Sequence, residues 1–420
     1  MDSDGDQDLI WSQGINTFGS SGFVGLYWTR KDALGNFTDI FTISTSTQGN
    51  LSLNFADLDN DGDTDFVSGT SLDHKLAYYK NIADTTFESQ KLISGSVAAV
   101  GGLCEADINN DGLLDLISGS SDGRISYFKN TGNRTFDFQK IIYTQFAYSG
   151  EGGTPIVKAG DIDNDGDTDI LAFSTYHSYT NGNNLVVLYW LENNGNETFT
   201  AHGLSQPTYA SLIDNQLFDV ELVDTDNDGD LDIITSHEHE NWIRKFVNQG
   251  GGVFGSSQLV NYVVNVKTIA IADMDNDGLK DIVAGTNQVS WLRNLGNNQF
   301  DQSVDLVTLN GEIQSLEVAD LDGDADMDIL IRNNFTSQID WLENLGNLTF
   351  SSPHVISLQP TYNTKLTPVD LDLDGDLDVL CSAYNGSTLT VWFENTGSGN
   401  FAHCRQLVLT TSKVLLIPWM

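Results

Sequence analysis

A nine-residue, aspartate-rich segment recurs along this 420-residue chain and constrains its fold more than any other feature. The clearest copy runs from Asp57 to Asp65, with aspartates at positions one, three, five, seven and nine and Gly62 at position six. Eight copies follow one another at a period of roughly 50 residues, the first of them truncated. A fixed period of this length is typical of chains built from one repeated structural unit.

The spacing of these aspartates suits calcium. Positions one, three and five of a tight loop direct alternate side chains toward one point, position seven supplies a backbone carbonyl, and position nine closes the shell. Calcium takes about six to eight oxygen ligands in such a shell. Glycine at position six permits the sharp turn, because a β-carbon disfavours the backbone angle needed there. The loops therefore predict up to eight structural Ca²⁺ ions, and a chance recurrence of solvated turn aspartates is a poor alternative.

The candidate metal ligands fall into eight loops. They are Asp2, Asp4, Asp6 and Asp8; Asp57, Asp59, Asp61, Asp63 and Asp65; Asp107, Asn109, Asp111, Leu113 and Asp115; Asp161, Asp163, Asp165, Asp167 and Asp169; Asp224, Asp226, Asp228, Asp230 and Asp232; Asp273, Asp275, Asp277, Leu279 and Asp281; Asp320, Asp322, Asp324, Asp326 and Asp328; and Asp370, Asp372, Asp374, Asp376 and Asp378.

The copies are not equal. Asn109 keeps an oxygen at position three but loses a charge, and Ala325 replaces the glycine at position six, which predicts a strained turn. The first loop lacks its position-one ligand. We expect weaker sites in these three loops and strong sites in the five loops that start at Asp57, Asp161, Asp224, Asp273 and Asp370.

A second motif keeps step with the loops: an aromatic residue, two further residues, Asn, then Gly and Phe. Trp190, Asn193, Gly195 and Phe199 form one copy. An apolar position precedes each loop, an apolar pair follows it, the aromatic–Asn segment comes next, and the Phe begins a fourth apolar stretch. Four short strands per repeat, with Asn and Gly turns, predict an all-β β-propeller.

We expect eight four-stranded blades in a single domain over residues 1–420, with seven blades as the alternative. The run Val414 to Pro418 stands where the first strand of the N-terminal blade is missing, so we expect it to complete that blade and close the ring. Closure would remove two exposed sheet edges. The alternative that the chain is a piece of a longer multidomain surface protein, cut at a repeat boundary, is compatible with this closure.

Composition limits the partners. The chain carries 59 acidic and 19 basic residues, a formal charge of −40, and the loops account for much of this acidity. Nucleic acid is not expected as a partner, because phosphate binding requires basic patches. No apolar run approaches the length of a membrane span, so we expect no membrane insertion. No signal peptide is visible, but weak calcium loops fill only at millimolar calcium, which favours an extracellular or cell-surface location.

The loop and the aromatic–Asn–Gly–Phe motif together resemble the FG-GAP/VCBS repeat of integrin α-subunit propellers and bacterial surface proteins. The segment Asp161 to Asp169, followed by Trp190 and Asn193, is especially similar to bacterial VCBS-repeat proteins. The resemblance covers essentially the whole chain and implies a calcium-loop propeller. It does not specify function, since this fold carries adhesins, lectins and some polysaccharide lyases. The Phe-Gly…Gly-Ala-Pro strings of integrins are absent, and eight repeats differ from their seven blades.

Strand order predicts two faces. The metal loops and the Asn–Gly turns share one face, whereas the other connections vary in length and are the usual place for binding. Tyrosines there could stack on sugar rings, and alternate histidines of one strand could share a transition metal or a sugar, or all could be ordinary solvated residues. The possible ligand-face residues are Tyr148, Tyr176, His177, Tyr179, Tyr209, His237 and His239. The tryptophans recurring at one register are expected in the core between blades: Trp190, Trp291, Trp341 and Trp392.

Three functions fit these observations. The favoured one is a calcium-stabilised extracellular binding or adhesion module that recognises a glycan or a protein. A calcium-dependent, polysaccharide lyase-like enzyme is an alternative, but it needs a base and a cation for the substrate carboxylate, and Lys and Arg are scarce on the variable loops. No catalytic residue is assigned. The third possibility is a ligand-free scaffold within a larger surface protein.

Overall fold

The computed structural model contains only β-strands as regular elements in the residues that it describes, with no helix among them. It describes residues 9–14, 23–31, 37–48, 51–70, 72–82, 86–144, 154–178, 183–204, 217–237, 241–336, 338–346, 349–357, 365–384, 388–410 and 413–415. Nothing in these ranges is a helix able to cross a membrane.

The chain divides into two compact units, which we describe separately. The first comprises Met1–Arg30, Asp39–Gln216 and Gln249–Phe254, and the second Lys31–Thr38, Leu217–Asn248 and Gly255–Met420. This division does not test the expectation of one domain over residues 1–420, which stays a prediction.

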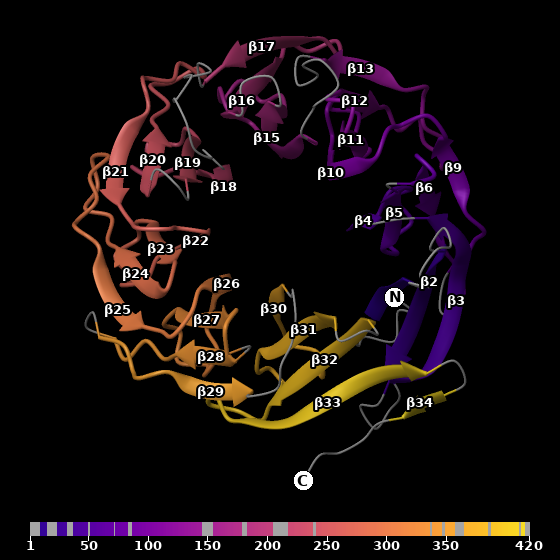
Figure 1. The fold of residues 1–420 in the computed structure, drawn as a ribbon. Coiled ribbons are helices and arrows are strands. Elements are labelled where there is room, and N and C mark those ends of the chain that lie inside the picture. The colour runs from indigo at the N-terminus through magenta and orange to yellow at the C-terminus, as the bar shows by residue number, and fades with distance from the viewer. Residues whose placement is uncertain are drawn as a thin grey trace. The chain divides into compact units, whose positions relative to one another are not determined.

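The first unit is made of antiparallel sheets whose strands follow chain order (Figure 1). They are β1 (Leu9–Gly14), β2 (Phe23–Lys31) and β3 (Phe37–Gln48); β4 (Leu51–Ala56), β5 (Asp65–Thr70), β6 (Leu76–Tyr79) and β9 (Lys91–Ser94); β10 (Val100–Ala106), β11 (Asp115–Ser120), β12 (Ile125–Phe128) and β13 (Lys140–Tyr143); β14 (Ile156–Gly160), β15 (Asp169–Ser178), β16 (Asn183–Asn193) and β17 (Phe199–Gly203); and the pair β7 (Asn81–Ile82) and β8 (Thr86–Phe87).

The second unit repeats the same meander. Its sheets are β18 (Leu217–Val223), β19 (Asp232–His237), β20 (Trp242–Phe246) and β21 (Gln258–Tyr262); β22 (Thr268–Ala272), β23 (Asp281–Gly285), β24 (Gln288–Leu292) and β25 (Val304–Thr308); β26 (Ile313–Ala319), β27 (Asp328–Asn333), β28 (Ile339–Leu342) and β29 (His354–Ser357); and β30 (Leu366–Val369), β31 (Asp378–Tyr384), β32 (Thr388–Asn395), β33 (Phe401–Thr410) and β34 (Lys413–Leu415). The all-β class and the four-stranded repeat are therefore confirmed.

The start of the fourth strand needs correction in several sheets. Phe199 and Phe401 do begin strands β17 and β33, as expected. Phe136, Phe300 and Phe350 instead form only an isolated bridge to the asparagine of the preceding turn. The strand proper begins four residues later, at Lys140, Val304 and His354 respectively. A short irregular segment therefore separates the phenylalanine from the fourth strand in these sheets.

The predicted pairing of the C-terminal run with the N-terminal blade is not what the structure shows for the described residues. Strand β34 folds back on β33, with Leu409 opposite Val414 and Val408 opposite Leu415. A tight hairpin allows this local pairing, whereas the predicted one would be long-range. The rest of the predicted closing strand, residues 416–420, lies outside the described residues.

The recurring aromatic residues pack between neighbouring sheets of one unit, as expected. Trp190, Trp291, Trp341 and Trp392 are each 4% exposed or less. Trp291 contacts Phe350 of the following sheet edge-on at 5.9 Å between ring centroids. Trp341 meets Phe401 of the following sheet in the same way. The aromatic of one repeat and the phenylalanine of the next therefore form a single inter-sheet contact.

The asparagine of the aromatic–Asn–Gly–Phe motif, which we call the turn asparagine, also joins neighbouring sheets. In five sheets its amide Nδ2 donates to a backbone carbonyl in the metal loop of the preceding sheet, at 2.7 to 2.8 Å. It also donates to its own metal loop at 2.9 to 3.2 Å. The residues are Asn130, Asn193, Asn294, Asn344 and Asn395. Sequence reasoning treated this residue only as a turn former.

Asn193→Ala should lower the free energy of unfolding by about 2–4 kcal/mol, because it removes the donor to the buried carbonyl of Ile108 and to the partly buried carbonyl of Thr168. Urea unfolding measures this effect. Asn194→Ala is the matched control: its exposed amide bonds within its own turn, to Thr198, so the loss should stay below about 1 kcal/mol. Equal losses for the two variants would contradict the inter-sheet role.

Candidate metal centres

Each described metal loop connects the first and second strands of its sheet. Seven of the loops lie in the described part of the chain, and the aspartate at position nine is always the first residue of the second strand. The turn asparagine contacts its own metal loop, so loop and turn share one end of the sheet, as predicted. Asp2, Asp4, Asp6 and Asp8 lie outside the described residues.

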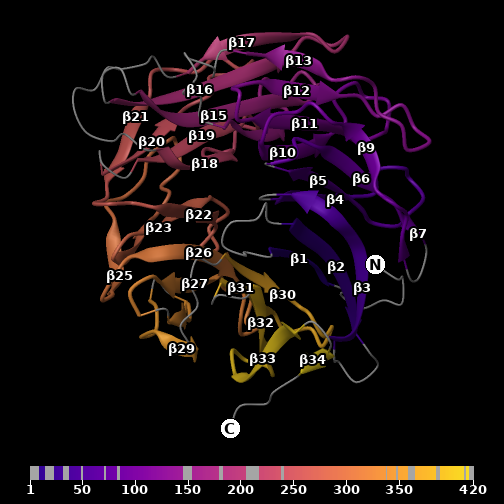
Figure 2. The same ribbon diagram turned by 45° about the vertical axis from the view of Figure 1, so that its right-hand side comes forward.

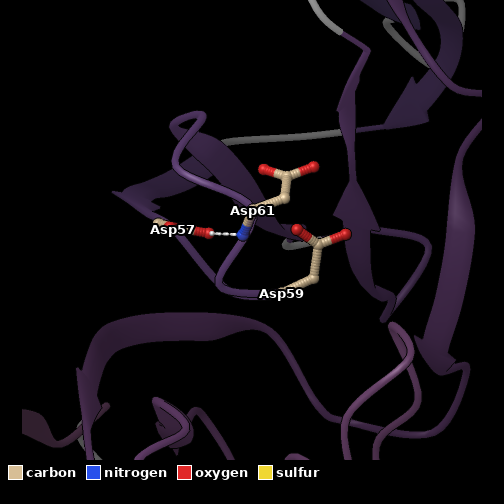
Figure 3. Close-up of side chains that lie close together, drawn as sticks. All are labelled: Asp57, Asp59 and Asp61. Carbon is tan, nitrogen blue, oxygen red and sulfur yellow. Dashed lines mark hydrogen bonds between the residues drawn. The ribbon is translucent and has the colours of Figure 1, made fainter.

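In at least five loops the carboxylates converge. Each of these groups offers three carboxylate oxygens within 4.8 Å of one another. The groups are Asp57, Asp59 and Asp61; Asp161, Asp163 and Asp169; Asp224, Asp226 and Asp228; Asp273, Asp275 and Asp281; and Asp320, Asp322 and Asp328. Figure 3 shows the first group, in which the backbone N–H of Asp61 donates to the carboxylate of Asp57 and the side chain of Asp59 lies nearby.

Backbone hydrogen bonds shape each loop around its position-one carboxylate. Asp57 accepts from the backbone N–H of Asp61 at 3.2 Å and of Gly62 at 2.9 Å. Gly62 has a φ of +95°, and a β-carbon there would meet nothing within 4 Å, so the backbone angle alone requires glycine. Ala325 adopts a φ of +76° at the same position, which confirms the expected strain.

The position-three carboxylates show that the loops fit a cation. The side chains of Asp59 and Asp275 are only 8% and 5% exposed. In each, the Oδ1 atom has no hydrogen-bond partner among the described residues. A buried carboxylate oxygen without a donor is costly, and a hard cation that prefers oxygen ligands would satisfy it. The residues present therefore fit calcium.

Position nine links the loop to the sheet. Asp65 is fully buried; its Oδ2 accepts from the backbone N–H of Leu58 at 3.3 Å and its Oδ1 from that of Asn81 at 2.8 Å. The same two bonds recur in the other six loops. Burial raises the pKa of Asp65 to about 6 and that of Asp328 to about 7, although these hydrogen bonds oppose the shift.

Position seven has two roles in the loops. In two loops its aspartate side chain links neighbouring loops: Asn110 donates to Asp167, and Asn276 to Asp326, both at 2.6 Å and both across to the next sheet of the same unit. Where it is leucine, at Leu113 and Leu279, only the backbone carbonyl can serve a metal. The expected backbone role of position seven therefore leaves its side chain available for loop-to-loop contacts.

The residue before the turn asparagine also reaches the metal loop, which sequence reasoning missed. Lys80 forms ion pairs with Asp59 and Asp61, and Arg293 pairs with Asp275 and Asp277. The signal was available in the sequence, because these basic residues stand at a fixed distance from a recognised motif. It was overlooked because spacing alone does not show toward which loop a side chain points.

The predicted ligand face is only partly described. Tyr176 and His177 belong to strand β15 rather than to a loop, because β15 and β16 pair as far as Ser178 and Asn183. Tyr148, Tyr179, Tyr209 and His239 lie outside the described residues. The structure therefore does not test whether His237 and His239 act together.

His237 ends strand β19 and lies beside residues that sequence reasoning had not considered. Its cross-strand partner is Trp242, which in turn is opposite Tyr262 on β21. Tyr262 is 57% exposed, and the guanidinium of Arg244 stacks over Trp242 at 4.3 Å. Burial, with a smaller contribution from Arg244, lowers the pKa of His237 to about 4, so the ring is neutral at physiological pH. These three aromatic side chains occupy one cross-strand row.

Comparison with known families gives five matches to the FG-GAP-like repeat, over residues 1–68, 57–118, 107–172, 224–284 and 273–331. The chain belongs to the FG-GAP repeat family. The matches omit residues 173–223 and 332–420, although the loop at Asp370 and the turn asparagine Asn395 recur there. FG-GAP repeats are often calcium-binding and are typical of extracellular or surface proteins.

Solved structures with similar folds are propeller-like. An Agrocybe aegerita lectin that recognises non-reducing terminal N-acetylglucosamine is 21% identical, with a TM-score of 0.55, over 84% of this chain and 90% of the lectin. The BP39L lectin of Burkholderia pseudomallei is 12% identical (TM-score 0.54; 83% and 96% covered). Sqt1 of Chaetomium thermophilum is 11% identical (TM-score 0.55; 92% and 97% covered). At these identities the likeness concerns the fold alone. No curated protein gives a significant sequence match.

In calcium-free buffer, the ninth-position carboxyls of this FG-GAP protein should make it less stable as the pH rises from about 4 to about 7. Their folded pKa values of about 6 to 7 exceed the ordinary value of about 4, so the folded state holds more protons across this window. Urea unfolding at pH 5 and pH 7.5 measures the difference.

Asp328→Asn provides the control for this pH dependence, because it removes the carboxyl with the highest of these values and should flatten the slope between pH 5 and pH 7.5. His237 contributes a slope of the opposite sign, but it is one group against several carboxyls. A metal-free protein that gains stability toward pH 7.5 would contradict the prediction.

Proposed function

We propose that this protein is a calcium-stabilised extracellular binding or adhesion module. The observation that carries the proposal is the partnerless Oδ1 of the buried position-three aspartates, Asp59 and Asp275. These oxygens lie among converging carboxylates that repel one another without a counter-ion. Calcium would neutralise the carboxylates and so order each loop. The position-nine aspartate would stabilise the turn as well, because it accepts hydrogen bonds from both the loop and the turn. The role of calcium here is structural, with up to eight ions.

The proposed ligand is a glycan or a protein, bound at the end of the sheets opposite the metal loops. The row of His237, Trp242 and Tyr262 supports a glycan, since Tyr262 is 57% exposed and an aromatic face beside polar groups suits the apolar face of a sugar ring. The lectins among the structural neighbours are consistent with this choice. Tyr148, Tyr176, His177, Tyr179, Tyr209 and His239 remain candidates for the same face.

One observation keeps a lyase-like enzyme as a second candidate. His237 is neutral at physiological pH, as a general base must be, and Arg244 is close enough to affect its pKa after the larger effect of burial. A base and a cation near each other are the minimum for acting on an acidic polysaccharide. A ligand-free scaffold within a larger surface protein is the third candidate.

We further propose that the repeated sheets are the blades of one eight-bladed propeller, which is exposed outside the cell or secreted as part of a longer multidomain protein. The repeat count, the acidic loops and the family's usual location support this. We propose neither nucleic acid nor a membrane interior as a partner, because the charge of −40 and the absence of long apolar runs disfavour both.

Removal of calcium should lower the melting temperature by at least about 10 °C. Each bound ion stabilises the folded state by about 3 kcal/mol at a hundred times its Kd, and several ions act together. Thermal unfolding in millimolar calcium and in excess chelator measures the difference. Magnesium is the control and should restore little, because it demands a smaller octahedral shell. An unchanged melting temperature would refute the structural role of calcium.

The ligand hypothesis can be tested on an array of neutral and acidic glycans in millimolar calcium. We expect specific retention that Trp242→Ala and His237→Ala reduce about tenfold or more, because stacking on the row is lost. Phe138→Ala is the matched control, since this phenylalanine is 99% exposed and lies on the short segment between the Asn130 turn and strand β13, outside the row. If no glycan on the array is retained, glycan recognition is contradicted, and a protein partner or a scaffold role is favoured.

A further inference from the structure

The residue immediately before each turn asparagine stands at the metal loop of its own sheet, and its charge varies between sheets. It is basic in three sheets, acidic in three and apolar in one. The basic residues are Lys80, Lys129 and Arg293; the acidic ones are Glu192, Glu343 and Glu394; the apolar one is Val247. The loops themselves are far more alike than these neighbours.

The basic residues contact the carboxylates that would bind a cation. Lys80 forms ion pairs with both Asp59 and Asp61, at positions three and five of its loop. Arg293 likewise pairs with position three and, through Nη2 at 3.1 Å, with position five, Asp277. Lys129 lies 3.7 Å from its position-five carboxylate. Lys80 and Arg293 therefore place a positive charge beside the carboxylates that a metal ion would neutralise, whereas Lys129 pairs more closely with Glu197, at 2.9 Å.

The acidic residues place a negative charge at the same end of the sheet. The carboxylate of Glu192 lies 2.6 Å from Nε2 of His202, whose ring stacks on Trp190 at 4.5 Å. Glu343 has the same arrangement with His354, 3.5 Å away, stacked on Trp341 at 5.1 Å. The paired histidine and tryptophan hold each glutamate in place.

The backbone places each glutamate beside its metal loop. Asn193, next to Glu192, donates its backbone N–H to the ninth-position carboxylate of Asp169 at 2.7 Å. Asn344, next to Glu343, donates in the same way to Asp328 at 2.7 Å. Glu192 and Glu343 therefore stand at the same place in their sheets as Lys80 and Arg293 do in theirs.

We propose that the residue before the turn asparagine sorts the metal loops into two calcium-affinity classes. The inference rests on the proposed calcium binding. A glutamate adds attraction for the ion, whereas a lysine or arginine competes with it. The loops at Asp161, Asp320 and Asp370 form the tight class, and those at Asp57, Asp107 and Asp273 form the weak class. The Asp224 loop is left out, because the residue there is Val247 and the buried Lys245 donates to Asn298, which in turn donates to Asp226 of that loop.

This ranking differs from the one that the loop sequences alone predict. Composition places the loops at Asp57 and Asp273 among the strong sites and the loop at Asp320 among the weak ones. The neighbouring charge reverses both assignments. A unit charge roughly 5 Å from a divalent ion changes its affinity about tenfold even at a water-like dielectric constant, which is enough to outweigh a strained turn.

The two classes also differ without metal. Lys80 and Arg293 partly neutralise their loops, so these loops should stay ordered when calcium is removed. The loops beside Glu192 and Glu343 gain an additional negative charge instead, and should open first. As the calcium concentration falls, the loops of the acidic class would therefore lose their order first, whereas the loops of the basic class would stay folded.

Calcium titration calorimetry on the full chain tests the proposal with two opposite charge changes. The wild-type chain should show tight and weak sites. Lys80→Glu should move one site from the weak to the tight class, and Glu192→Lys one site from the tight to the weak class, each with a change in Kd of about tenfold or more. Arg124→Glu is the matched control: it makes the same change in net charge as Lys80→Glu on a half-exposed residue paired with Asp122, and it should leave both classes unchanged.

The possible results distinguish a failure of calcium binding from a failure of the two affinity classes. Absence of calcium binding by the wild-type chain would overturn the proposed function itself. Normal binding with no redistribution in either variant would overturn only the two-class proposal. Lys80→Met and Glu192→Gln remove charge without reversing it and keep the test valid if a full reversal prevents folding; each should give a shift in the same direction. Hydrogen exchange in chelator should then show faster exchange at residues 161–169 than at residues 57–65, and the reverse order would also overturn the proposal.

Discussion

The buried carboxylate at position nine is the group on which the rest of each repeat depends. Asp328 begins strand β27 and accepts the backbone N–H of Leu321 in the loop and of Asn344 in the turn, at 2.9 and 2.7 Å. Asn344 in turn donates to Met274 of the preceding sheet at 2.8 Å. Three pieces of chain therefore meet at one aspartate, and a fourth is joined to them through Asn344. Because a buried charge is tolerated only with such partners, changing one member affects all of them.

This network explains why an acidic chain can have well-packed sheets at all. The aspartates that repel one another are confined to one end of each sheet, while the aromatic contacts, such as Trp291 on Phe350, lie in the apolar space between sheets. Figure 2 shows two such neighbouring sheets, β22–β25 and β26–β29, side by side. Electrostatic cost and hydrophobic gain are thus spatially separate. A cation in the loop, whether calcium or a tethered lysine, reduces the first without disturbing the second.

Much of the fold could be predicted, because the local patterns agree with the long-range packing. The strand pattern, the burial of the tryptophans and the positive φ of Ala325 all follow from residue type and spacing. The late start of strands β13, β25 and β29 did not, since the phenylalanine bridges to the turn asparagine before the strand begins. The position of Tyr176 and His177 was wrong because β15 and β16 continue beyond the usual strand length of the repeat.

By itself, the sequence determined the repeat, the all-β class and the identity of the carboxylates that share each loop, because ligand spacing and strand alternation are local properties of the chain. Only the tertiary structure decided which charges surround those carboxylates and which sheets they join. Lys80 is far in sequence from Asp59, and Asn344 from Met274, and their contacts exist only after strands and neighbouring sheets have packed. The direction of a side chain across a sheet is a property of register and packing, and no spacing in the sequence encodes it.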